Sequence, residues 1–110
     1  MNFKEMSLKE IEDFIKKEVP FDKIEGNTGV YETRSVGKDY LGDDITLGVT
    51  FDGYCDCDNN ERKPLFIFNV FTKDEFIDLR PVLQVAVDDG IPDLILSDIK
   101  CVVCGLMENE

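Results

Sequence analysis

The first repeating pattern of apolar residues along the chain has the spacing of an α-helix. Ser7 and Glu10 form a capping-box pattern, in which each side chain can satisfy an unpaired backbone N–H group at the start of a helix. Apolar residues then recur at helical spacing from Leu8 to Ile15, and Pro20 ends the pattern. The sequence therefore predicts an amphipathic N-terminal helix.

Four later segments have the patterns of strands. Val30–Val36 is mixed, as is typical of an edge strand, whereas from Ile45 to Phe51 apolar residues alternate with small or polar ones, which predicts a half-buried strand. Leu65–Phe71 is a continuous apolar run, which favours a central strand covered on both faces. Leu94–Val103 follows a turn signal at 89–90 and predicts a further strand.

The segment between the central strand and that turn gives conflicting signals. Thr72 and Glu75 repeat the capping-box spacing and begin an apolar stripe of helical period, which Pro81 must interrupt. Val82–Val87 fits a short helix or a strand, because valine loses side-chain freedom in helices. Together these patterns predict one α+β domain over residues 1–110, with two helices packed on a mainly antiparallel sheet of three to five strands.

The charge of the chain narrows the classes of partner. Asp and Glu number 24 against 12 Lys and Arg, with no His, so that the formal net charge is −12. Direct binding to nucleic acid or to an anionic membrane is disfavoured, because neutralising phosphates requires clustered basic residues. No apolar run reaches the ~18 residues that cross a bilayer, and the N-terminus lacks a signal-type hydrophobic stretch. We therefore expect a soluble, cytoplasmic protein.

Catalytic signatures are missing from the sequence. The absence of histidine excludes Ser–His–Asp and Cys–His catalysis, and there is no P-loop or G-x-G-x-x-G fingerprint. Asp56, Asp58 and Asn60 imitate the first ligands of a calcium-binding EF-hand loop, but Glu61 occupies the position that requires glycine. Asp52 and the tripeptide that begins at Glu61 match a nuclease D…E-x-K arrangement only superficially, in an anionic field that would repel its substrate. We expect that the protein is not an enzyme.

Four cysteines give the sharpest local signal. Cys55 and Cys57 form a C-x-C pair, and Cys101 and Cys104 form a C-x-x-C pair followed by glycine, as in a zinc knuckle. Four thiolates around Zn²⁺ would make a closed structural site. In an extended strand, however, Cys101 and Cys104 would point to opposite faces and could not share one metal. Two hypotheses stay open, namely a structural zinc site and four reduced thiols, two of them packed as small apolar groups.

The size of the negative charge indicates a cationic protein partner. A net charge of −12 exceeds the roughly 2 to 8 typical of a small domain, and the resulting self-repulsion lowers stability beyond what solubility requires. We therefore predict an inhibitor of the immunity-protein or anti-defence type that blocks a basic protein, such as a toxin, a nuclease or another nucleic-acid-handling protein. Tyr40, Leu41 and Tyr54 are the expected apolar anchors. The predicted partner-binding residues are Asp39, Tyr40, Asp43, Asp44, Asp52, Tyr54, Asp56, Asp58 and Glu61.

The alternative hypothesis is a zinc-stabilised or purely structural accessory domain whose acidic surface is incidental. The two hypotheses predict different responses to added salt and to metal removal. Partner binding should weaken steeply with salt under the first, whereas metal removal should unfold the protein under the second.

Overall fold

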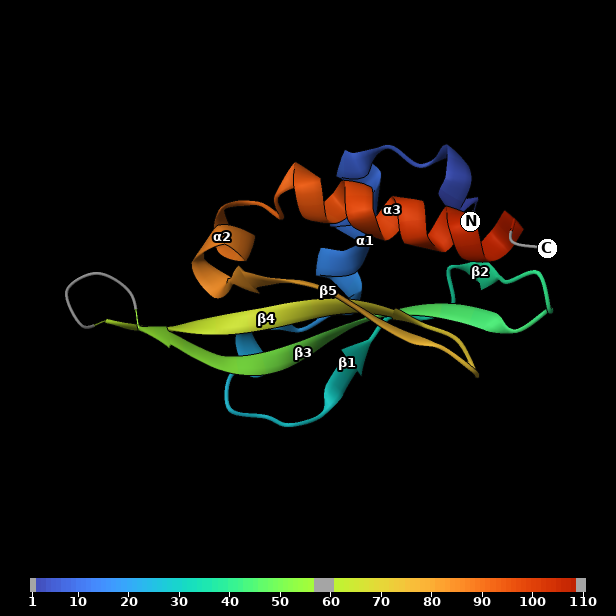
Figure 1. Cartoon of the computed structure of the whole chain (residues 1–110). Helices are drawn as coiled ribbons and strands as arrows, with labels where there is room; N and C mark the ends of the chain where they lie inside the picture. Colours follow the sequence, from blue (N-terminus) through green and yellow to red (C-terminus); the bar gives the residue numbers. More distant parts are fainter. Residues whose placement is uncertain (1, 57–60, 109–110) are drawn as a thin grey trace.

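The computed structural model describes residues 2–56 and 61–108, in which five antiparallel strands form one sheet with the helices on one of its faces (Figure 1). The strand order is β1-β3-β4-β5, and β2 pairs with the start of β3. The strands are β1 (Val30–Glu32), β2 (Gly37–Lys38), β3 (Asp44–Asp56), β4 (Arg62–Phe71) and β5 (Phe76–Leu83). The helices are α1 (Leu8–Glu18), α2 (Gln84–Asp89) and α3 (Asp93–Glu108), with 3-10 turns η1 (Phe3–Glu5) and η2 (Phe21–Lys23). The predicted α+β class is confirmed.

Helix α1 begins at the predicted capping box. The Glu10 backbone N–H donates to Ser7 Oγ at 3.1 Å, and the Ser7 N–H donates to the Glu10 carboxylate at 3.0 Å. Ile11 and Ile15 are fully buried, so that the apolar stripe read from the sequence faces the core. None of the helices in the described residues is long and apolar enough to cross a membrane.

Strand β4 is central, as predicted, but it is not covered on both faces. It lies between β3 and β5 in register with both strands. Phe66, Phe68 and Val70 are buried on the side of the helices, whereas Ile67 and Phe71 are only half-buried on the other side. Figure 1 shows that all the helices lie on the same side of the sheet. We call the side without helices the open face.

The segment after β4 is a strand, so the predicted helical stripe from Phe76 to Leu83 was wrong. Thr72 Oγ1 accepts from the N–H groups of Asp74 and Glu75, at 3.3 and 3.2 Å, as an N-cap side chain would do. Here the same contacts close a tight turn, in which the Thr72 N–H donates to the Glu75 carbonyl. The chain then reverses, and β5 pairs with β4.

Residues 94–103 are helical, so the predicted strand was wrong as well. They belong to α3, and Ile95, Leu96, Ile99 and Val103 are buried along one side of it. The undecided segment 82–87 contains both structures, because β5 ends at Leu83 and α2 begins at the next residue. Packing of these residues on the sheet overrides the strand preference of valine and isoleucine.

Candidate functional site

The predicted partner-binding residues are divided between the two ends of β3. This strand runs for 13 residues from Asp44 to Asp56, which at about 3.3 Å per residue separates its ends by roughly 40 Å. The longest dimension of the molecule is 48 Å. Asp39, Tyr40, Asp43 and Asp44 therefore lie at one end, while Asp52, Tyr54, Asp56 and Glu61 lie at the other, and Asp58 is outside the described residues.

Three segments far apart in the sequence meet at the first of these ends. Thr46 of β3 is in register with Phe71 of β4, which is in register with Phe76 of β5, so that the β2–β3 loop lies near the β4–β5 turn. The Tyr40 N–H donates to the Leu106 carbonyl at 3.1 Å and fastens the loop to the C-terminal part of α3. Figure 1 shows β2, its loop and the end of α3 together at the right of the view. We call this region the acidic end.

The acidic end has a large surplus of carboxylates over cations. Its two described ion pairs are Lys38–Asp44, at 2.8 Å, and Lys4–Glu108. The Lys38 ammonium and the Ser35 hydroxyl lower the pKa of Asp44 by bonding to its charged form. The eight acidic residues are Glu5, Asp39, Asp43, Asp44, Asp74, Glu75, Asp78 and Glu108, against the three lysines Lys4, Lys38 and Lys73.

The β2–β3 loop owes its shape to Asp39. Its carboxylate accepts from the N–H groups of Leu41 and Asp43, at 2.9 and 2.8 Å, and its own N–H donates to the Asp43 carbonyl. Gly42 completes the turn with a φ of 88°, a conformation that side chains disfavour. The loop presents Tyr40 and Leu41, which are 49% and 62% exposed. The main role of the Asp39 carboxylate is therefore to position these two apolar side chains, and its contribution to the surface charge is secondary.

The β4–β5 turn adds residues that the sequence-based prediction missed. Phe76 is 55% exposed and stacks on Phe71 with ring centroids 5.5 Å apart. Asp74 and Glu75 precede it, and within the described ranges neither forms an ion pair. The prediction placed these residues at the start of a helix, although the adjacent acids and the aromatic residue were visible in the sequence.

At the opposite end of β3, cations offset more of the acidic residues. The Arg62 guanidinium lies 4.2 Å from the centroid of the Tyr54 ring, and Lys63 lies 3.9 Å from Glu61. A hydrogen bond to Glu25, together with burial, raises the pKa of Tyr54. The acidic residues of this end are Glu12, Glu18, Asp22, Glu25, Asp52, Asp56, Glu61, Asp88 and Asp89, against Lys16, Lys17, Lys23, Arg62 and Lys63. Nine carboxylates against five cations leave a surplus of four, slightly smaller than the surplus of five at the acidic end.

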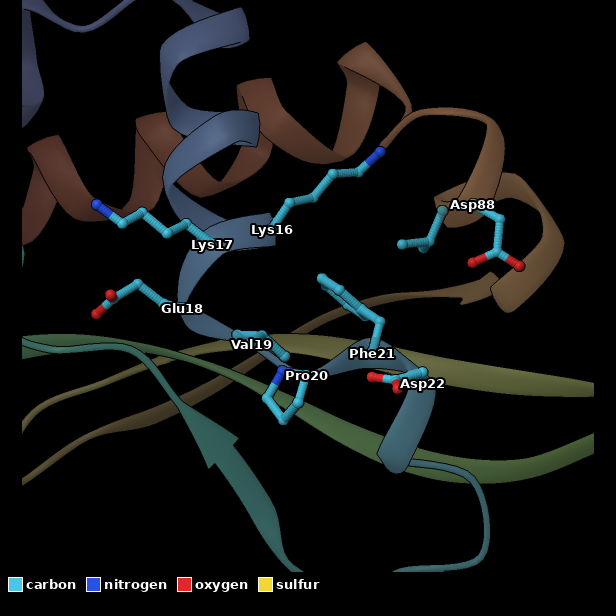
Figure 2. A pocket seen from close by; sticks show the side chains of 9 residues that line it. Lys16, Lys17, Glu18, Val19, Pro20, Phe21, Asp22 and Asp88 are labelled. Atoms are coloured by element: carbon cyan, nitrogen blue, oxygen red, sulfur yellow. The ribbon is translucent and has the colours of Figure 1, made fainter.

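An open groove of about 610 Å³ lies near this end between α1, η2 and α2 (Figure 2). Its lining includes charges of both signs, with Asp22 and Asp88 to one side and Lys17 on the far side of α1. Lys16 is held by Glu12, 3.7 Å away. The groove thus has a more even balance of the two charges than the acidic end.

The cysteines have a different arrangement from the predicted one. Cys101 and Cys104 are one turn apart on α3 and line the same groove of about 290 Å³, together with Leu8 and Lys100. The objection that an extended strand would turn this pair to opposite faces therefore does not apply, because the segment is helical. Cys55 is in register with Lys63 on β4, and Cys57 lies outside the described residues.

The described residues contain no group of three or more Cys, Asp or Glu side chains that could hold a metal ion. A site with all four cysteines would include Cys57, so the zinc hypothesis stays a prediction. Comparison of the chain with protein-family models, with curated proteins and with solved structures finds no match.

Proposed function

We propose that the protein is a small acidic inhibitor, of the immunity-protein or anti-defence type, that binds and blocks a basic, nucleic-acid-handling protein through the acidic end. One observation carries this proposal: the acidic end has eight carboxylates against three lysines, and it exposes the side chains of Tyr40, Leu41 and Phe76. Apolar anchors within a charged rim are the usual composition of an interface hot spot. Complementary charge accelerates association with a basic partner.

Burial of these three exposed side chains in a complex would contribute to the free energy of binding. Burial of a large apolar side chain stabilises a complex by about 1.5 to 3 kcal/mol, before the entropy lost on association is subtracted. Leu41 and Phe76 are among the most exposed large apolar residues of the described chain, and both belong to the acidic end. A purely structural role gives no reason for this coincidence of charge and apolar surface.

The proposal is tested by isolating the partner and reconstituting the complex. A pull-down from lysate at low and high ionic strength should recover a basic protein at low salt. The purified pair should bind less tightly as the salt concentration rises, because screening shortens the range of the electrostatic attraction. The nuclease or other activity of the partner should be lost in the complex. Recovery of no basic protein at either ionic strength would contradict the proposal.

Two double variants remove the same charge from opposite ends of the molecule. Asp74→Asn with Glu75→Gln acts at the acidic end, whereas Asp88→Asn with Asp89→Asn acts on α2. The first should slow association about tenfold at low salt, and the second should change it by less than about twofold. Equal effects would show that only the total charge matters and that the acidic end is not the docking surface.

The second candidate is a zinc-stabilised accessory domain, favoured by the position of Cys101 and Cys104 on one side of α3. Elemental analysis of the purified protein should then find about one zinc per chain. A zinc content near zero with freely titratable thiols would reject this candidate.

A further inference from the structure

The open face of the sheet has a simple layout that follows from the strand register. One row across the strands consists of Glu32, Gly48, Asn69 and Asp78, which are consecutive partners in β1, β3, β4 and β5. The next row on one side consists of Thr46, Phe71 and Phe76, and on the other side of Val30, Thr50, Ile67 and Pro81. A polar row therefore lies between two rows that are mainly apolar.

These rows form a continuous surface. A side chain at Gly48 would meet Asn69 Oδ1 at 2.3 Å, a Val30 methyl carbon at 2.8 Å and the Phe71 ring at 3.1 Å. These three groups therefore close over the glycine, and Asn69 is buried although no helix covers it. Val30 and Phe76 remain exposed at the two sides of the face.

The open face alone is smaller than a standard protein interface. Four strands span about 14 Å, and the rows from Phe76 to Leu83 span roughly 20 Å, which gives a flat area of roughly 300 Å². A stable protein interface covers about 800 Å² on each partner. Phe76 belongs both to the open face and to the acidic end, so the two regions adjoin there and one partner can contact both.

Two carboxylates on the edge strands of the open face indicate that the partner covering it is positively charged. Glu32 and Asp78 end the polar row, about 14 Å apart across three strand spacings. Within the part of the chain that the structure describes, neither carboxylate has an ion-pair partner. A second copy of this chain would bring the same carboxylates into one interface, and such like-charge contacts oppose association by several kcal/mol.

We infer that the basic partner extends from the acidic end across the open face. Its contact surface has apolar groups that cover Phe71, Phe76 and Val30, and cationic groups that reach Glu32 on β1 and Asp78 on β5. This inference rests on the proposed function, because it specifies where and how the same partner docks.

A peptide probe tests the surface without knowledge of the partner. The probe is a short amphipathic helical peptide built of leucine and lysine, and binding is followed by backbone NMR and by fluorescence titration at several salt concentrations. Phe76→Ser removes an anchor of the open face, and Leu94→Ser, at the start of α3, is the matched control because the two residues are 55% and 54% exposed. Circular dichroism establishes that both variants are folded.

The expected result is a loss of affinity of about tenfold for Phe76→Ser and of less than about twofold for Leu94→Ser, because burial of a phenylalanine side chain exceeds the 1.4 kcal/mol that corresponds to tenfold. Glu32→Gln with Asp78→Asn should also reduce the salt dependence of binding, whereas Asp88→Asn with Asp89→Asn should not. Equal losses for Phe76→Ser and Leu94→Ser, or no loss for either, would overturn the inference.

Sedimentation velocity tests the alternative that a second copy of this chain covers the open face. The wild-type protein should remain a monomer, and a dimer that Phe76→Ser dissociates would show that a second copy covers the face. Failure of the inference and failure of the proposed function are separable. If a basic partner is recovered but Phe76→Ser leaves both the partner and the peptide bound, only the inference fails.

Discussion

Replacement of Glu12 by glutamine should destabilise the protein by about 1 to 2 kcal/mol. Glu12 is only 8% exposed on α1, and its carboxylate accepts from the backbone N–H of Ile91 at 2.6 Å, across 79 residues of sequence. A hydrogen bond to a charged group contributes about 1.5 to 3 kcal/mol, and the short distance is typical of such bonds. Glutamine keeps a neutral acceptor, so part of this contribution should remain. The partners Lys9 and Lys16 are more exposed and add little.

Urea unfolding with circular dichroism measures this effect. The midpoint should fall at unchanged slope, and the melting temperature should drop by roughly 5 to 10 °C for a chain of this size. Asp13→Asn is the control, because Asp13 is exposed on the same helix and, among the residues that the structure describes, forms an ion pair with Lys9 alone, at 3.2 Å. It should change stability by less than about 0.5 kcal/mol. A loss as large for Asp13→Asn as for Glu12→Gln would refute the reasoning.

The effect should also depend on pH. Burial by itself raises the pKa of Glu12, but the Ile91 N–H and the nearby lysines outweigh it, so that the pKa lies below its ordinary value of 4.5. The charged carboxylate therefore stabilises the fold above the unfolded pKa, and this contribution is lost as the pH falls through the lower folded pKa. Wild type and Glu12→Gln should differ most near neutral pH and converge below about pH 4.

Three further predictions concern other parts of the molecule. Gly48→Ala should destabilise the protein by about 1 to 3 kcal/mol, because the added methyl group would overlap three neighbours. Gly105→Ala has open space in α3 and should stabilise the protein by about 0.5 to 1 kcal/mol. Thermal melts of the two variants measure both effects. Glu25→Gln should lower the raised pKa of Tyr54 toward its ordinary value of 10.0, as followed by NMR of the tyrosine ring. Dialysis against a zinc chelator should leave the melting temperature unchanged, and a marked fall would support the zinc-stabilised alternative.

The sequence predicted the elements whose signals are local and unambiguous. The capping box of Ser7 and Glu10 is present, and the run that begins at Leu65 is the central strand. The Thr72–Glu75 spacing was misleading, because the same side-chain contacts cap a helix or close a turn. Only the pairing of the following residues with β4 decides between the two, and such pairing is not a local property of the chain.

The candidate site was harder to predict for a similar reason. The acidic loop around Tyr40 was recognised, but Phe76 was not, because only the register of β3, β4 and β5 brings both to the same end of the sheet. The prediction also joined this loop with residues around Tyr54, since it could not know that β3 continues to Asp56 and separates them. For α3, the positions of Ile95, Ile99 and Val103 had helical spacing that was overlooked in favour of their strand propensity.

Carbodiimide cross-linking of the reconstituted complex tests the docking surface most directly, because it joins carboxylates of this chain to lysines of the partner without a spacer. Peptide mass spectrometry then locates each link. We expect the links at Asp43, Asp74, Glu75 and Asp78, and their loss at high salt. Links that occur mainly at Asp22, Asp56 or Asp88, or evenly over all exposed carboxylates, would contradict the proposal that the acidic end and the open face hold the partner.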